Sequence, residues 1–275
     1  MRFYTKEDVQ KFDTIPFLYI KTSLSGHLFT ITLNRPEKRN AFTPTMTEEI
    51  TFALAYAHFN SEVRCVIVNA SGPVFCAGAD LNAFHDQSAN IRNANLPATR
   101  EDIKLGDAFV QLLKPSIAQV EGPVLAGGFL IVCGCTFVVS TNDANYSLPE
   151  VKRGIWPMQV MASLMQIIPA RKVLEMCITA KSYNVDEAYH LGLVTQVSTK
   201  ESIADDVNIL ADQILQNAPL AIQMGMKALQ NLSEIRDSEK QSYLKSQLDL
   251  LMQTDDAKEG ASAFREKRKP DWKGE

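Results

Sequence analysis

The 275-residue sequence lacks the features that mark several classes of protein. Its formal charge is only −4 at pH 7, so the chain has no bulk electrostatic attraction to nucleic acid or to an anionic membrane. Its start has no apolar signal core, and no apolar run is long enough to span a bilayer. We therefore expect a cytoplasmic protein that interacts with neither nucleic acid nor membranes.

Patterns for metal binding, disulfides and nucleophilic catalysis are missing as well. The five cysteines are odd in number, lie inside apolar runs and form neither a zinc pattern nor a Cys-x-x-Cys pair. This predicts buried thiols in a reducing compartment and no metal site. None of the four histidines has a motif context, and only His85, in a polar stretch, is worth following.

The chain does contain the pattern of an α/β protein. With 45% apolar and 22% charged residues it has the composition of a soluble globular protein, and it is long enough to bury a substantial core. Residues 17–22 and 27–33 are rich in β-branched and aromatic side chains, which predicts a hairpin. A helix from Thr43 to about Asn60 and a buried strand over 63–69 follow. This alternation implies parallel strands with crossover helices.

The rest of the chain is predicted from the same spacing rules. The polar segment 85–99 has no period and is expected to be a mobile loop over the site. Further strands are expected at 116–120, 136–140 and 193–197, and helices at 103–113, 158–168, 170–179, 185–191, 202–216, 219–232 and 238–252. We divide the chain into an N-terminal extension on the surface (1–16), a core domain (17–198) and a helical C-terminal region (199–275).

A glycine-containing turn after the strand at 116–120 is the first candidate for chemistry. The following helix is expected to open at Gly127-Gly128, where the backbone N–H groups have no partner within the helix and the helix dipole favours negative charge. Such groups can form an oxyanion hole. The alternative is close packing of the helix against the strand, and the glycines alone favour that alternative.

Glu150 is the second candidate. It follows Pro149 in a loop between apolar residues, where burial disfavours the charged carboxylate and should raise its pKa toward values useful for proton transfer. A lone glutamate in a loop is more often simply exposed. The nearby oxyanion-type turn makes the two interpretations equally strong.

Several stretches of the sequence together resemble the motifs of a known family. The stretch from Lys114 to Leu130 resembles the signature of the crotonase superfamily, the enoyl-CoA hydratase/isomerase family. Three more stretches are similar to motifs of that family, in the same order and spacing: Leu33–Phe42, Phe75–Leu81 and Lys258–Pro270 with Trp272. The resemblance implies a crotonase-type spiral of ββα units with a helical C-terminal oligomerisation region. It also implies a homotrimer or homohexamer.

The resemblance also implies roles for individual residues. The backbone N–H groups of Ala79 and Gly127 would hold a thioester oxygen, and Glu150 would move the proton. Lys38 and Arg39 would border the CoA phosphates, and Phe264 and Lys267 would approach the adenine and phosphates, in an adjacent subunit; an ordinary basic end of the chain is an equal alternative for the last two. The remaining positions matched to the acyl-CoA site are Ala41, Ala77, Asp80, Leu81, Leu125, Ala126, Leu130, Pro149 and Met158. For Asp80, a helix-capping role is favoured over binding.

The sequence departs from the family at two points. Hydratases of this family use two glutamates on the added water, and Leu130 occupies the position of the first. The usual glycine-rich turn is replaced by Met158–Met161, which makes the pocket bulkier. Glu121 and Asp143 lie nearby, but structural roles are favoured for both.

These departures favour one reaction without deciding it. The chain is predicted to act on an acyl-CoA thioester through a stabilised enolate, with Glu150 as the single acid/base and double-bond isomerisation as the favoured reaction. A hydratase, and a related lyase or decarboxylase, remain alternatives. A non-catalytic acyl-CoA-binding protein is the alternative of another class, favoured if Leu130 and Met158 block the acyl group. No cofactor is expected, with coenzyme A entering as part of the substrate.

Overall fold

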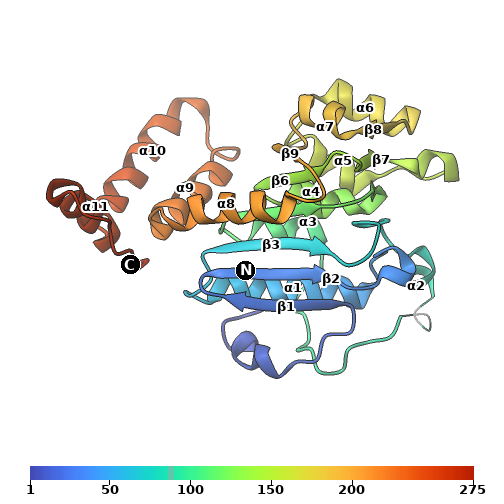
Figure 1. Ribbon diagram of the computed structural model, residues 1–275, viewed down its shortest axis with the longest axis horizontal. Coiled ribbons are helices and arrows are strands. Elements are labelled where there is room, and N and C mark those ends of the chain that lie inside the picture. The colour runs from blue at the N-terminus through green and yellow to red at the C-terminus, as the bar shows by residue number, and fades with distance from the viewer. Residues whose placement is uncertain (87, 89) are drawn as a thin grey trace.

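The fold is built on a six-stranded sheet (Figure 1). A computed structural model describes residues 1–86, 88 and 90–275. The strand order is β1-β2-β3-β4-β6-β9, and every neighbouring pair is parallel except β1 and β2. The strands are β1 (Ile20–Ser25), β2 (Leu28–Leu33), β3 (Cys65–Ala70), β4 (Ser116–Val120), β6 (Phe137–Thr141) and β9 (Gln196–Ser198). The predicted α/β class with parallel strands is therefore confirmed.

The two faces of this sheet are covered by different helices. α1 (Pro44–Phe59) packs on one face, and α8 (Ile203–Leu215) packs on the other, against β3, β4 and β6. Alternate residues of β3 point to opposite sides, as the period of a strand requires. Val66 and Val68 join the main core, whereas Cys65 and Ile67 join the cluster under α8.

The first hairpin is present, but its turn lies later than expected. Ser25 pairs with Leu28, so the connection consists of Gly26 and His27 alone. Gly26 has a φ of +55°, a left-handed conformation that glycine adopts without steric cost. A two-residue connection fixes the pairing register of the two strands.

A second, three-stranded sheet was not predicted. It has the order β5-β7-β8 and consists of β5 (Val124–Leu125), β7 (Asn145–Ser147) and β8 (Ser182–Asn184). β5 and β7 are parallel, and β8 runs antiparallel to β7. These strands have two or three residues each, too few to show a period of two.

The N-terminal segment is part of the core, which corrects the expectation that residues 1–16 lie on the surface. Phe3, Tyr4 and Phe12 are at most 4% exposed. The ring of Phe12 stacks on Tyr56 of α1 at a centroid distance of 3.9 Å. A short 3-10 helix, η1 (Asp8–Thr14), turns these side chains inward. Apolar contact with α1 therefore outweighs the polar composition of the segment.

The segment 85–99 does not form the expected loop over the site in its described part. Asn93 is 7% exposed and donates to the carbonyl of Pro16 and to the carboxylate of Glu49, each over 2.8 Å. Glu49 also accepts from the backbone N–H groups of Leu18 and Tyr19. This buried polar network ties the segment to the N-terminal part of the chain. Gln87 and Ala89 lie outside the described residues.

The helices after β4 run from the core into a C-terminal arm, which we define as residues 217–275. The expected bounds hold for α6 (Ala170–Thr179), while α3 (Leu105–Val110) and α5 (Met158–Leu164) are shorter than predicted. The remaining helices are α2 (Leu81–His85), α4 (Phe129–Gly134), α7 (Val185–His190), α9 (Pro219–Asn231), α10 (Asp237–Leu251) and α11 (Asp255–Glu266). α11 had been predicted only as a tail. In Figure 1, α10 and α11 extend away from the sheets.

The cysteines and the apolar helices can be compared with what the sequence predicts. All five cysteines are free thiols; four are buried and Cys133 is half-buried. Burial raises the pKa of Cys65, Cys76 and Cys135 to about 12, so these thiols stay protonated. In the part of the chain that the structure describes, no helix combines the length and apolarity needed to cross a bilayer.

Candidate active site

The small second sheet brings the two candidate stretches together. β5 leads directly into a 3-10 turn, η4 (Ala126–Gly128), and β7 is followed, after Leu148, by another, η5 (Pro149–Arg153). Because β5 and β7 are parallel neighbours, their carboxyl ends lie at the same edge of the sheet. Gly127 and Glu150 therefore lie side by side, although 23 positions apart in the sequence.

The backbone N–H groups of Ala79 and Gly127 also lie close together. A Cβ atom on Gly127 would be 3.4 Å from the backbone nitrogen of Ala79. A Cβ atom on Gly78 would be 2.9 Å from the backbone nitrogen of Gly127, and Gly78 has a φ of +91°. Only glycine allows this approach. The preceding Ala126 adopts a φ of +51°, a strained conformation for alanine of the kind found at functional sites.

Hydrogen bonds from the loop after β2 hold the segment Gly78–Asp80 in place. Phe42 and Ala79 form a parallel bridge, with Phe42 N donating to Gly78 O and Asp80 N donating to Phe42 O, both over 2.9 Å. The side chain of Asn40 is fully buried and donates to the carbonyls of Ser71 and Val74. The loop after β2 is therefore fixed against the segment Gly78–Asp80.

Asp80 performs the capping role favoured from the sequence. Its side chain accepts from the backbone N–H of Ala83 in the first turn of α2. It also forms an ion pair of 2.8 Å with Arg35, whose ring-stacked guanidinium lies over Tyr19. Burial alone would raise the pKa of Asp80, but the hydrogen bonds from Arg35 and from the backbone hold it below its usual value.

A cavity of about 400 Å³ opens beside these donors. Its wall is mainly apolar and aromatic, and Glu150 and Arg153 are its charged lining residues within the described chain. The lining residues that were predicted from the sequence are Ala77, Ala79, Leu81, Ala126, Gly127, Leu130, Pro149, Glu150 and Met158. Leu130 and Met158 thus form part of the wall and leave the cavity open.

Glu150 has the environment of a proton-transfer group. It is 9% exposed, and burial raises the pKa of its carboxyl, an effect that a backbone hydrogen bond and the positive charge of Arg153 partly oppose. Its Oε2 atom is buried and has no hydrogen-bond partner among the described residues. A buried carboxylate oxygen without a partner is costly unless a substrate group faces it.

No second acid joins Glu150 in the described lining of the cavity. Leu130, which the resemblance matched to the first glutamate of two-glutamate members, is 6% exposed and lines the cavity. Glu121 accepts from Gln119 Nε2, and Asp143 accepts from the hydroxyl of Thr141. Both acids have the structural contacts expected of them. The exposed His85 bonds to the carbonyl of Leu81 and is not a lining residue.

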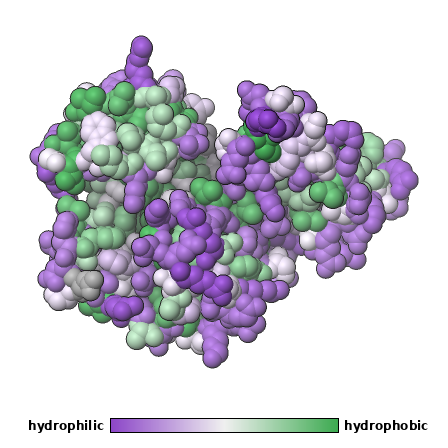
Figure 2. Space-filling view, turned by 180° about the vertical axis from the view of Figure 1, so that it is seen from behind, coloured by the Kyte–Doolittle hydropathy of each residue, from purple (hydrophilic) through white to green (hydrophobic). Residues whose placement is uncertain are grey.

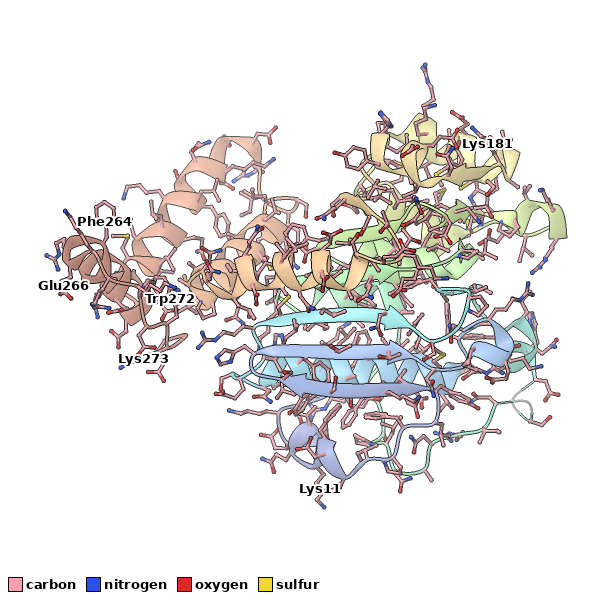
Figure 3. The ribbon with its side chains drawn as sticks, viewed as in Figure 1. Lys11, Lys181, Phe264, Glu266, Trp272 and Lys273 are labelled. Atoms are coloured by element: carbon pink, nitrogen blue, oxygen red, sulfur yellow. The ribbon has the colours of Figure 1, made fainter. Side chains whose placement is uncertain are left out.

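The other positions matched to the CoA site are spread over the molecule. Lys38 and Arg39 lie exposed at η2 (Pro36–Lys38), on the loop that reaches Ala77 through Arg39 O. Ala41 and Leu125 are not among the described lining residues of the cavity. Phe264 is 86% exposed on α11, and Lys267 caps that helix. Figure 3 shows Phe264 at the outer end of the arm, remote from the sheets, so one chain does not bring it to its own cavity.

Much of the cavity wall consists of residues that were not predicted from the sequence. Residues not expected there are Phe42, Thr47, Phe84, Arg153, Ile155, Trp156 and Pro157. Gln159 and Val160 belong to the Met158–Met161 turn that was expected at the pocket, and Ile103 and Leu105 come from the segment predicted as a helix at 103–113. Phe42 lay inside a recognised motif, and Arg153 is three residues after Glu150 on the same turn. Proximity to a motif was therefore the available signal for these two.

Similarity to known proteins extends over most of the chain. The family model described as enoyl-CoA hydratase/isomerase matches residues 24–275. The chain belongs to this family. An enoyl-CoA hydratase of Mycobacterium tuberculosis is 31% identical over 251 residues, covering 90% of this chain and 93% of that protein. A carnitinyl-CoA dehydratase of Escherichia coli O157:H7 is 31% identical, covering 91% and 96%.

Solved structures of the enoyl-CoA hydratase/isomerase family share the fold. An enoyl-CoA hydratase/isomerase from Mycobacterium paratuberculosis has a TM-score of 0.84 at 26% identity, covering 94% of this chain and all of that one. An enoyl-CoA hydratase from Mycobacterium tuberculosis has a TM-score of 0.83 at 27% identity, with 94% and 99% covered. The crotonase-type fold predicted from the motifs is confirmed, and the chain is an enzyme of this family, with which an acyl-CoA substrate is consistent.

Proposed function

We propose that this enzyme moves a carbon–carbon double bond in an enoyl-CoA thioester, with Glu150 as the only acid/base. The observation that carries the proposal is the pairing of one buried carboxylate, Glu150, with Leu130 where a second carboxylate would be needed to position water. An apolar residue there excludes the group that would bind and activate a water molecule. Proton transfer within the acyl chain needs no second carboxylate.

The proposed reaction has two proton transfers. In a 3-enoyl-CoA, the Glu150 carboxylate takes a proton from C2, and the electron pair delocalises into the thioester as a dienolate. The N–H groups of Ala79 and Gly127 donate to the oxygen as its negative charge grows; one such donor is worth about 3 kcal/mol of barrier. Glu150 then returns the proton at C4, which gives the 2-enoyl-CoA and restores the carboxylate.

The cavity wall supports an uncharged hydrocarbon acyl chain. Phe84, Leu105 and Trp156 are among its apolar and aromatic lining residues. Arg153 is its only basic lining residue in the described chain, which disfavours a cationic acyl group by charge repulsion. Since Leu130 and Met158 leave a cavity of about 400 Å³, steric blocking of the acyl group gives no support to a binding-only protein.

Hydration of a 2-enoyl-CoA is the second candidate. The names of related proteins support it, since they include enoyl-CoA hydratase, mevalonyl-CoA hydratase and carnitinyl-CoA dehydratase. With a single glutamate, water would have to be held by Glu150 and substrate alone.

We also propose that the arm packs against other copies of the chain, as a homotrimer or homohexamer. Phe264, Leu229 and Met252 of the arm are between 61% and 86% exposed, an unfavourable state for large apolar side chains that association relieves. Figure 2 shows a hollow between the arm and the main body, and apolar side chains gathered on the body near α5 and α6. Light scattering after size exclusion tests this, and a monomer would contradict it.

The function is tested by incubating 3-enoyl-CoA and 2-enoyl-CoA separately with the enzyme in heavy water. Chromatography separates the isomers and mass spectrometry detects a water adduct. We expect the wild-type enzyme to convert 3-enoyl-CoA to 2-enoyl-CoA and the Glu150→Gln variant not to do so. A hydrated product from the 2-enoyl substrate, without isomerisation, would overturn it in favour of hydration.

A further inference from the structure

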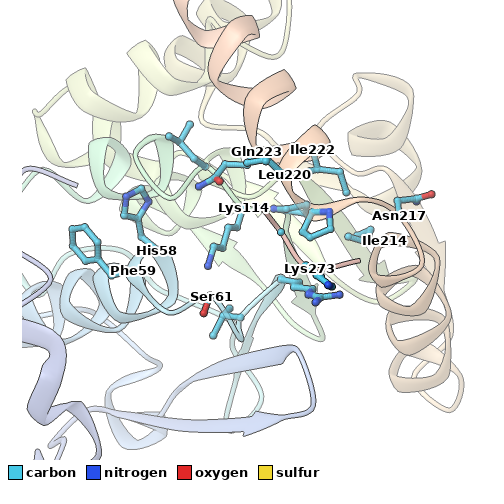
Figure 4. Close-up of a pocket in the computed structure, with 16 residues that line it drawn as sticks. His58, Phe59, Ser61, Lys114, Ile214, Asn217, Leu220, Ile222, Gln223 and Lys273 are labelled. Carbon is cyan, nitrogen blue, oxygen red and sulfur yellow. The ribbon is translucent and has the colours of Figure 1, made fainter. Parts of the chain in front are cut away.

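A second cavity, of about 210 Å³, lies at the end of the large sheet where β3 and β4 begin (Figure 4). It opens at the amino ends of β3 and β4, beside the end of α1 and the start of α9, whereas the active site lies beyond the carboxyl ends of strands. Lys114 and Pro115 precede β4, and Lys273 belongs to the last residues of the arm. The cavity is therefore formed jointly by the core and the arm.

Its charged lining residues carry one sign only. Arg64, Lys114 and Lys273 line it together with His58, and no aspartate or glutamate is among the described lining residues. This contrasts with a chain whose net charge is −4. Cations that face one space repel one another, and the repulsion is strongest where water is scarce. It falls mainly on the half-buried Lys114 and Arg64, because Lys273 is exposed and also lies near Asp255 and Glu259 of the arm. An anion between them would remove that cost.

Two of the three cations, Lys114 and Arg64, are positioned by hydrogen bonds to backbone carbonyls. Lys114 Nζ donates to the carbonyls of Ala57 and Asn60 at the end of α1, each over 2.7 Å, which leaves its third N–H free. Arg64 donates from Nη2 to the carbonyl of Trp272 over 2.9 Å. Both residues are half-buried. These contacts fix the cations and still leave donors for a ligand.

Lys273 is held by a buried acid of the arm. Asp256 is 2% exposed, and its carboxylate accepts from the backbone N–H groups of Lys273 and Gly274 over 3.0 Å and from that of Leu220 over 3.5 Å. The indole N–H of Trp272 donates to Gln216 O over 2.7 Å. These hydrogen bonds hold the C-terminal tail against the end of α8 and the start of α9. The Asp256 carboxylate accepts from backbone N–H groups and is not a lining residue of the cavity.

Two titratable groups respond to this environment. Burial lowers the pKa of Lys114 to about 8, so its ammonium is charged at neutral pH but poorly solvated. Burial also lowers the pKa of His58, whose Nδ1–H donates to Leu112 O, so the ring is neutral at pH 7. An anion in the cavity would raise the pKa of Lys114.

We propose that this cavity binds a phosphate-class oxyanion, held by Lys114 and Arg64 from the core and by Lys273 from the arm. Ser61, Asn217 and Gln223 supply uncharged hydrogen-bonding groups in the same lining, as a tetrahedral oxyanion requires. Figure 4 shows Lys114 and Lys273 on different sides of the cavity, with Ser61 below them. Because the ligand contacts both parts, its binding stabilises the placement of the arm on the core.

The test is calorimetric titration of the intact protein with inorganic phosphate and, separately, with glycerol 3-phosphate. Lys273→Gln should weaken binding about tenfold, equivalent to about 1.4 kcal/mol. Lys227→Gln is the matched control, because Lys227 is an exposed lysine of α9 outside the cavity. Its affinity should stay within about twofold of wild type. A tighter monoester would identify an organic phosphate as the ligand, and equal affinities would identify free phosphate.

Hydrogen exchange measured with and without phosphate locates the site. We expect slower exchange of the backbone amides of residues 272–274 when phosphate is present, and loss of that effect in Lys273→Gln. No saturable binding at millimolar phosphate, or equal weakening by Lys227→Gln, would overturn the proposal. Protection elsewhere with none at 272–274 would also overturn it.

Discussion

Arg35 donates from Nη1 to Oδ2 of Asp80 over 2.8 Å, across 45 positions of sequence. The same Nη1 donates to the carbonyl of Ala41, so one guanidinium joins the loop after β2 to the start of α2. Asp80 directly follows Ala79, whose N–H faces the proposed thioester oxygen. The ion pair therefore fixes the backbone next to the proposed oxyanion donor, Ala79.

Breaking this pair should destabilise the protein and misplace the donor. Asp80→Ala leaves Arg35, 11% exposed, without its carboxylate and removes the cap of α2, for which we expect a loss of about 2 kcal/mol in unfolding free energy. Urea unfolding measures it. Asp80→Asn retains a capping oxygen and should lose less. Equal stability of Asp80→Ala and wild type would contradict a structural role for the pair.

Gly127→Ala should damage catalysis far more than folding. The added methyl would lie 2.8 Å from Phe42 Cζ and 3.4 Å from Ala79 N, inside the space of the oxyanion. We expect kcat/KM to fall by about 10²-fold or more, as for loss of one oxyanion donor. Gly225→Ala on α9 is the control, since its methyl meets no atom within 4 Å. It should leave activity unchanged and stabilise by about 0.5–1 kcal/mol.

The reaction rate and the unfolding free energy should both depend on pH through the burial of Glu150. Burial raises its pKa above the usual 4.5, and the carboxylate form is the base, so the rate should fall as pH drops through the raised value. Between the usual and the raised pKa, the folded state binds more protons than the unfolded state. Unfolding free energy should therefore decrease as pH rises through that window.

The Glu150→Gln variant tests whether the unfolding free energy falls with rising pH because of Glu150. This variant should not show that fall, and it should be at least as stable as wild type at neutral pH, since it buries no charge there. Thermal unfolding at several pH values measures both proteins. A wild type that gains stability over the same window relative to Glu150→Gln would contradict a raised pKa.

Leu130→Glu should add hydration to the activities of the enzyme. Leu130 lines the same cavity as Glu150, so a carboxylate there would let two acids position one water molecule. Hydrated product from 2-enoyl-CoA, detected by mass spectrometry, should appear in this variant. Leu130→Gln has similar size without the charge and should not show the gain. A folded Leu130→Glu without hydration would mean that Leu130 is not what limits this reaction.

Phe12→Ala should test the unexpected role of the N-terminal segment. Phe12 is 4% exposed and packs against Tyr56, Phe17 and Phe29, so we expect a loss of about 3–5 kcal/mol in unfolding free energy. Lys11→Ala is the control, because the Lys11 side chain points to solvent (Figure 3) and should change stability by less than about 0.5 kcal/mol. Equal stability of the two variants would place the segment outside the folding unit.

The sequence predicted the elements that have a long period or a strong boundary. The bounds of α6 (Ala170–Thr179) were predicted to the residue, and β4 (Ser116–Val120) was too, because a buried strand between turns has a clear pattern. The strands β5, β7 and β8 were missed because two or three residues cannot show alternation. These short strands are nevertheless what places Gly127 beside Glu150.

The site was predicted where a local motif exists and missed where tertiary contact decides. Glu150, Gly127 and Ala79 could be named from motifs, and the structure brings them together at one cavity. Trp156 and Thr47 line the same cavity, but nothing in their local sequence separates them from other core residues. The burial of Phe3 and Phe12 was hidden by polar neighbours, because burial there depends on a distant helix.

The most direct test of a single acid/base is the fate of the proton that Glu150 removes. A 3-enoyl-CoA carrying deuterium at C2 is converted in ordinary water in a single turnover, and the 2-enoyl-CoA product is analysed for deuterium at C4. Since Glu150 is buried and its Oε2 has no other partner in the described chain, we predict that part of the label moves from C2 to C4. Isomerised product with no label at C4, or no isomerised product, would contradict it.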